Sequence, residues 1–214
     1  MGKIDYKKTE KHLYLPKFPA VLQVPEMVFF AVDGAGDPNT SPAYAQAMEI
    51  LYGLSFTVKM SKMSGEEPEG YVDYVVPPLE GLWWTDDPGF DGKPPADKGD
   101  FRRTSLIRQP DFVNEEVFAW ALERLAKKKP GLPLEKARFL RWEEGLCAHI
   151  LHTGPYDSEP ASIGALEAFI TGQGYVQDLS DTRRHHEIYL SDPRRTTPAK
   201  LKTLIRHPIR RESA

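Results

Sequence analysis

Hydrophobic positions along the chain form short runs of two kinds, which predict strands and helices. Runs rich in β-branched and aromatic residues predict strands at 27–32, 71–76, 82–84, 103–108, 137–142, 146–151, 186–190 and 202–206. Asp33-Gly34 predicts a turn after the first of these strands, and Glu143-Glu144-Gly145 predicts a hairpin between the fifth and sixth. Residues 1–20 follow neither pattern, and we expect them to form an irregular arm.

Apolar residues at helical spacing predict three helices. The first begins at Ser41-Pro42, the second is capped by Asn114 and ends at Pro130-Gly131, and the third begins at Pro160. The chain therefore combines strands and helices along its length.

The same order of elements occurs twice. Leu106-Ile107-Arg108-Gln109-Pro110 recurs as Leu204-Ile205-Arg206-His207-Pro208, and Asp87-Pro88 recurs as Asp192-Pro193. Pro42 and Pro160 both stand at helix starts. These ordered matches predict one domain over 1–214, with a first repeat at about 20–112, a connecting helix at about 113–130 and a second repeat at about 136–210.

The expected fold is therefore α+β, built from tandem duplicated strand-helix-strand-strand units related by pseudo-twofold symmetry. Antiparallel sheets would carry helices on one face, and a ligand cleft would lie between the copies.

Composition excludes several classes of function. The chain has 28 Lys and Arg against 31 Asp and Glu, for a net charge of −3, so nothing favours nucleic acid or a membrane as partner. The single cysteine, Cys147, excludes an internal disulfide and lies in an apolar run typical of a buried, inert thiol. The charged N-terminus is unlike a signal peptide, and no apolar run is long enough to span a membrane, so we expect a cytoplasmic protein.

Strand alternation selects the candidate chemistry. On the strand at 186–190, Ile188 and Leu190 share one face, suited to packing under a helix, while Glu187 and Tyr189 share the other. If that second face lines the cleft, a carboxylate and a phenol project into it side by side. The alternative is that Glu187 is a solvated strand residue.

Aromatic residues near strand ends supply the expected walls of the cleft. Trp83 and Trp84 are adjacent, so they point to opposite faces; one can line the cleft, although both can equally be structural. The predicted ligand-binding residues are Glu80, Trp83, Trp84, Tyr71, Trp142, Tyr156, His185, Glu187 and Tyr189. Such a cleft suits flat, lipophilic and often cationic molecules, and a desolvated carboxylate in it can act as a general base.

No motif indicates a metal or a cofactor. His185 and His186 are adjacent on a strand and point apart, as do His149 and His152, so neither pair can share a metal ion. The sequence has no HExxH, P-loop, dinucleotide-binding glycine pattern or GxSxG nucleophile motif. We expect neither a metal nor a cofactor.

Four segments carry a resemblance to a known family: Val75-Val76-Pro77-Pro78-Leu79-Glu80-Gly81-Leu82-Trp83, Ile107-Arg108-Gln109-Pro110-Asp111-Phe112, His152-Thr153-Gly154-Pro155-Tyr156 and His186-Glu187-Ile188-Tyr189-Leu190-Ser191-Asp192-Pro193. In this order they resemble the GyrI-like small-molecule-binding proteins, relatives of the effector-binding domains of some AraC- and MerR-type regulators. The resemblance covers about residues 20–210 and implies the tandem fold, with an acidic residue in a drug pocket that corresponds to Glu187.

The resemblance implies binding of drugs or toxins, with a role in sequestration or resistance. It also leaves a hydrolase open, because some members open the cyclopropane of DNA-alkylating antibiotics with an acid and a tyrosine. Glu187 would then activate water, and Tyr189, Tyr156 or Tyr71 would hydrogen-bond the substrate carbonyl. A third alternative is a protein-interaction module, as for gyrase inhibitors, that uses the loop at 86–100. The chain has no helix-turn-helix segment, so we do not expect it to bind DNA.

Overall fold

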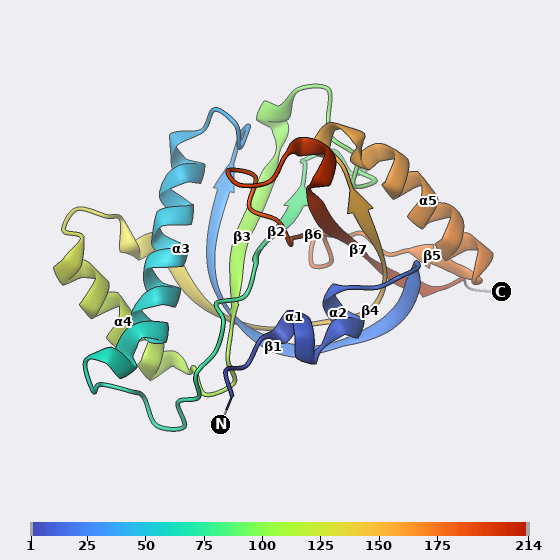
Figure 1. The fold of residues 1–214 in the computed structure, drawn as a ribbon. Coiled ribbons are helices and arrows are strands. Elements are labelled where there is room, and N and C mark those ends of the chain that lie inside the picture. Colours follow the sequence, from blue (N-terminus) through green and yellow to red (C-terminus); the bar gives the residue numbers. More distant parts are fainter. Residues whose placement is uncertain (1, 213–214) are drawn as a thin grey trace.

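Six antiparallel strands close into a barrel in the computed structural model, which describes residues 2–212 (Figure 1). Their order is β4-β1-β3-β2-β6-β7, and β7 pairs back with β4. The strands of the barrel are β1 (Ala20–Ala35), β2 (Leu79–Trp84), β3 (Arg102–Gln109), β4 (Ala137–Thr153), β6 (His185–Tyr189) and β7 (Lys202–Arg211). The short strand β5 (Tyr175–Gln177) pairs with the far end of β7.

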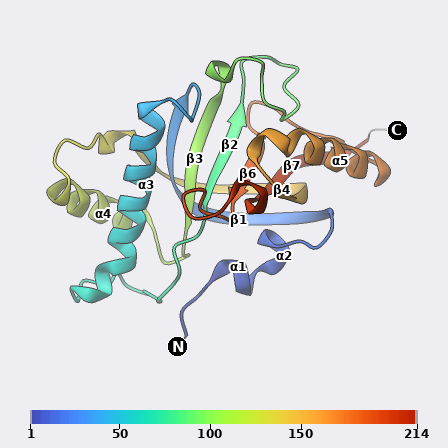
Figure 2. The ribbon, with the colours of Figure 1, turned by 45° about the horizontal axis from the view of Figure 1, so that its top comes forward.

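Three long helices lie outside the barrel, in two groups (Figures 1 and 2). Helices α3 (Pro42–Met60) and α4 (Glu115–Lys128) pack over Phe30 and Ile107 on one side, and α5 (Glu159–Gly172) packs over Ile205 on the other. In the described part of the chain, no helix is both long and apolar enough to cross a membrane.

The predicted helix starts are confirmed. Pro42 is the first residue of α3, where its missing N–H costs no hydrogen bond. The Asn114 side chain accepts a hydrogen bond from the Val117 N–H at 2.9 Å and so caps α4. The third helix begins one residue earlier than expected, at Glu159.

Both predicted interruptions of strands are wrong. Strand β4 runs without a hairpin through Glu143–Gly145, because β1 begins at Ala20 and gives it a partner along most of its length. Strand β1 also continues through Asp33-Gly34, which pair with β3. A Cβ on Gly34 would lie 3.0 Å from the Arg103 guanidinium, so the glycine makes room for that side chain.

Two other segments differ from the prediction. Residues 1–20 contain helices α1 (Tyr6–Thr9) and α2 (Lys11–Tyr14), and Leu13 and Tyr14 are buried in the core. Residues 71–76 form no strand, apart from one bridge between Tyr74 and Ile4, because β2 occupies the edge of β3 only from Leu79 onward.

The order strand-helix-strand-strand recurs, as β1-α3-β2-β3 and then as β4-α5-β6-β7 with β5 inserted. The two sets do not face each other across an open cleft, because β1–β4 and β2–β6 pairing joins them into one barrel. Its inner face, which we expected to be open, is filled by a core that includes Leu13 and Tyr14. Duplication and pseudo-twofold symmetry stay predictions.

The packing of Leu13 is testable by truncation. Leu13→Ala is expected to lower the free energy of unfolding by about 2–5 kcal/mol, since it leaves a cavity in the barrel core. Urea denaturation measures this change. Leu15→Ala is the matched control, because Leu15 lies on the same arm but is 38% exposed. Equal, small effects of the two substitutions would show that the arm does not stabilise the barrel.

Candidate functional site

Strand pairing divides the predicted site residues between the two faces of the barrel wall. Gly81 pairs with Glu187 and Trp83 pairs with His185, and these side chains lie on the outer face, which carries the long helices. Glu80 and His186 alternate with them and face inward. The prediction that His185 and His186 point apart is confirmed, whereas Glu187 shares its face with the long helices instead of lying opposite to them.

Glu187 is the centre of a hydrogen-bonded group on the outer face. Its Oε1 accepts from His185 Nε2 at 2.9 Å, and its Oε2 accepts from the Tyr189 hydroxyl at 2.7 Å. Trp83 Nε1 donates to the same hydroxyl at 2.9 Å. The Glu187 side chain is 15% exposed, so the carboxylate is held in orientation and still meets solvent. We call Trp83, His185, Glu187 and Tyr189, together with the neighbouring Glu159 of α5 described below, the Glu187 cluster.

Gly81 packs against this group, where a side chain would not fit. A Cβ on Gly81 would stand 2.5 Å from Trp83 Nε1 and 3.1 Å from the Tyr189 hydroxyl. Any larger residue at position 81 would therefore displace the donors that orient Glu187.

A second histidine, on β7, extends the group along the outer face. His185 Nδ1 lies 2.7 Å from His207 Nε2; because His185 donates its Nε2 proton to Glu187, we assign the shared proton to His207. Burial and the neighbouring His185 hold the pKa of His207 well below its ordinary value, so this histidine is neutral. Gly92, at a φ of +93°, packs its backbone against both rings, and a Cβ there would lie 2.7 Å from His185 Nδ1.

Glu159 brings a second carboxyl to the cluster. It is the first residue of α5, is only 4% exposed and lies against Glu187. Burial and the charge of Glu187 hold the pKa of Glu159 far above its ordinary value, so this carboxyl keeps its proton near neutral pH. A proton-bearing carboxyl and a hydrogen-bonded carboxylate therefore stand side by side.

Phenols surround this pair. The Tyr156 ring packs edge-on against Tyr189, with the ring centroids 6.0 Å apart, and is 37% exposed. Burial, with contributions from Glu159 and Glu187, raises the pKa of Tyr156 to about 12. Tyr44 of α3 lies over the Arg103 guanidinium, 4.9 Å from ring centroid to Cζ, and burial and Glu187 raise its pKa too.

Four predicted ligand residues lie away from this cluster. Tyr71 donates to the Lys59 carbonyl at 2.8 Å, beside the C-terminal end of α3. Trp84 points to the other side of β2 from Trp83 and stacks with Arg184. Glu80 and Trp142 lie inside the barrel. The structure does not bring these four residues together with Glu187, because alternation along the strands turns three of them to the opposite face and Tyr71 lies in the coil at 71–76.

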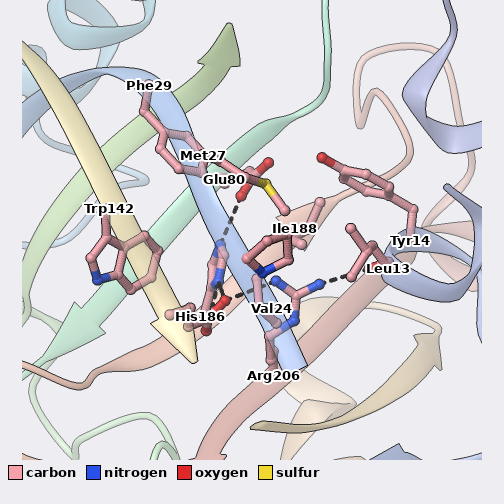
Figure 3. A pocket seen from close by; sticks show the side chains of 12 residues that line it. Leu13, Tyr14, Val24, Met27, Phe29, Glu80, Trp142, His186, Ile188 and Arg206 are labelled. Atoms are coloured by element: carbon pink, nitrogen blue, oxygen red, sulfur yellow. Dashed lines mark hydrogen bonds and ion pairs between the residues drawn. The ribbon is translucent and has the colours of Figure 1, made fainter. Parts of the chain in front are cut away.

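Inside the barrel, Glu80, Glu144, His186 and Arg206 form what we call the interior charge cluster (Figure 3). His186 Nε2 lies 2.9 Å from Glu80 Oε2, and its Nδ1 lies 3.1 Å from Glu144 Oε1. Arg206 donates to Glu144 Oε2 at 2.8 Å and to the Leu13 carbonyl at 2.7 Å. Burial opposes a charge on His186, but Glu144 and Glu80 outweigh it and raise its pKa, so two cations balance two anions.

The interior charge cluster has no room for a drug-sized ligand. The cavity beside it has a volume of about 10 Å³, enough for about one water molecule. We therefore place the candidate site at Glu187, on the outer face.

Sequence reasoning missed Glu159, Tyr44 and His207. Glu159 precedes Pro160 at a helix start, and no local pattern connects it to Glu187 twenty-eight positions later. Cys147 is fully buried, as predicted, and burial raises the pKa of its thiol. Within residues 2–212, no three His, Cys, Asp or Glu side chains are grouped as a metal site would require.

Comparison with solved structures shows close relatives. A hydrolase from Listeria innocua is 43% identical, covers 97% of this chain and 100% of its own, and has a TM-score of 0.88. An uncharacterized conserved protein from Listeria innocua is 44% identical, with the same coverage and a TM-score of 0.91. The EcmrR C-terminal domain is 12% identical over 91% of this chain and 98% of its own, and its TM-score of 0.51 shows a shared fold alone. No curated protein matches.

The family model for the GyrI-like small molecule binding domain matches residues 18–210, nearly the whole chain. The match includes every strand of the barrel, except for Arg211 at the end of β7, and every member of the Glu187 cluster. This chain belongs to the family of GyrI-like small-molecule-binding domains.

Proposed function

We propose that this protein binds lipophilic, aromatic and often cationic small molecules at the Glu187 cluster, and that it sequesters such compounds or protects against them. The observation that carries the proposal is the partly exposed Glu187 carboxylate, held by His185 and Tyr189 and bordered by the partly exposed ring of Tyr156. With Glu159 protonated, the pair has a net negative charge and attracts a cation.

Physical magnitudes agree with such a ligand. A charge-assisted hydrogen bond to a carboxylate contributes about 1.5–3 kcal/mol, and a cation over an aromatic face adds about 0.5–2 kcal/mol. The aromatic rings supply further affinity that does not depend on direction, which suits flat ligands of varied shape.

A second candidate function is hydrolysis of an electrophilic ring compound at the same place, for example the cyclopropane of a DNA-alkylating agent. It is favoured by the 43% identity to a Listeria innocua protein named a hydrolase and by the adjacent carboxyls of Glu159 and Glu187. Glu187 would take a proton from water. Tyr189 already donates to Glu187 and accepts from Trp83, so Tyr156 is the better donor to a substrate carbonyl.

Removal of the charge at Glu187 tests the binding function. Glu187→Gln is expected to weaken binding of a lipophilic cationic dye about 10- to 100-fold, because one charge-assisted contact is lost. Fluorescence titration measures the dissociation constant, with an uncharged dye of similar shape as the control ligand. Glu49→Gln on α3, where the exposed Glu49 pairs with Lys129, is the control variant. Undiminished affinity in Glu187→Gln would remove this residue from the site.

The space at Gly81 gives an independent test. Gly81→Ala is expected to weaken dye binding and to lower the free energy of unfolding by about 1–3 kcal/mol, because the new methyl group displaces Trp83 or Tyr189. Gly164→Ala is the matched control, since a Cβ there meets nothing within 4 Å. Thermal unfolding and dye titration should separate the two variants. If Gly81→Ala behaved as Gly164→Ala does, the donors around Glu187 would not depend on that space.

Hydrolysis is tested by mass spectrometry. The protein is incubated with a cyclopropane-bearing alkylator, and we expect a product heavier by one water, formed with turnover and lost in Glu187→Gln. Product formation no faster than in buffer, from a protein that still binds the compound, would leave binding alone.

A further inference from the structure

Stabilisation of helix α5 does not explain the buried position of the Glu159 side chain. The N-terminus of a helix normally presents an acidic residue to solvent, where it stabilises the helix dipole as an anion. Here the side chain is turned into the protein, is 4% exposed and lies against a second carboxyl, that of Glu187. Its Oε1 has no hydrogen-bond partner among the described residues.

Each other polar group at this point is already engaged or is a weaker acid. Tyr189 donates its proton to Glu187, and His185 donates its Nε2 proton to the other oxygen. Burial raises the pKa of the phenols of Tyr156 and Tyr44 above that of free tyrosine. The titratable and charged groups around Glu159 are Tyr156 and Asp157 before α5, Glu187 and Tyr189 of β6, His152 of β4 and Asp192 after β6, with the hydroxyl of Thr203 on β7 beside it.

We propose that Glu159 is the general acid that acts together with Glu187 as the general base in hydrolysis at this site; the inference rests on the hydrolytic form of the proposed function. A buried pair of carboxyls that holds one proton between them can give that proton to a substrate while the other member accepts one from water. The arrangement suits an uncharged, strained ring whose opening delivers an electron pair to an oxygen.

The proton balance closes within the pair. A water oxygen forms a bond to a ring carbon, and the ring C–C bond breaks. The released electron pair moves through the conjugated system to the carbonyl oxygen, which takes the proton of Glu159. Glu187 takes a proton from the attacking water. The product is the substrate plus one water, and direct transfer of a proton from Glu187 to Glu159 restores the starting state.

Glu159→Gln tests this role, because glutamine matches the size and neutrality of the protonated acid but cannot give up a proton. Turnover of a cyclopropane-bearing alkylator is expected to fall about 10²- to 10⁴-fold, while its dissociation constant stays unchanged. In the wild type the rate should decline as pH rises through the pKa of Glu159, since the acid form is lost. That alkaline decline should be absent in Glu159→Gln, and Glu159→Asp should recover part of the rate.

A direct measurement of the proton accompanies the kinetics. Infrared spectroscopy at neutral pH should show the C=O stretch of a protonated carboxyl in the wild type and not in Glu159→Gln. Glu49→Gln is the matched control, because the Glu49 side chain is exposed on α3, pairs with Lys129 and is not one of the groups around Glu159. This variant should keep the wild-type rate and pH profile.

Two outcomes would overturn the assignment. One is a Glu159→Gln variant that hydrolyses the probe at the wild-type rate although Glu187→Gln is inactive. The other is wild-type protein that binds the compound but never opens the ring, which would remove the acid role and leave the binding function in place. Failure of the wild-type protein to bind the cationic dye would instead refute the proposed site.

Discussion

Closure of the sheet into a barrel is the constraint on which the rest of this structure depends. Once β7 pairs with β4, each strand residue faces either the sealed interior or the outer surface under the helices. Neighbouring residues in β6 are thereby assigned to different environments. The His186 side chain faces the interior, and the side chains of His185 and Glu187 lie on the outer face.

Acidic residues are stabilised in different ways on the two faces of the barrel wall. In the interior, Glu80 and Glu144 meet His186 and Arg206, so the buried charges cancel, and the remaining cavity is no larger than a water molecule. Such a balanced group is costly to break and suits a structural role. On the outer face, Glu159 is neutral because its carboxyl keeps a proton, whereas Glu187 is partly exposed to solvent. The outer face therefore keeps an acidic group that a ligand can reach.

Elements far from β6 in the chain complete the outer group. Helix α5 contributes Glu159 from its first turn, and the loop between β2 and β3 lays Gly92 on the histidine pair. Ion pairs connect this loop to the turn before α5, through Lys98 and Asp157, and to the middle of α5, through Lys93 and Glu167. The loop thus packs on the histidine pair, and the geometry of Glu187 depends on this loop and on α5 as well as on its own strand.

Local sequence patterns determined the positions of most strands, the helix starts and which side chains of one strand share a face. Pro42, Asn114 and Pro160 mark real helix starts because capping and proline geometry act within a few residues. The pairing of Glu187 with Tyr189 followed for the same reason, since a period of two needs no knowledge of the fold. The motifs around these residues were also enough to indicate the family.

Tertiary structure alone decided which face is enclosed and which residues from distant elements meet. The sequence could not show that β4 continues past Gly145, because that depends on a partner strand more than a hundred positions away. It could not show that residues 6–14 fill the barrel, or that Glu159 and His207 lie beside the residues around Glu187. Such contacts depend on strand register and helix docking, which are settled by burial over the whole molecule and leave no mark in any short stretch of chain.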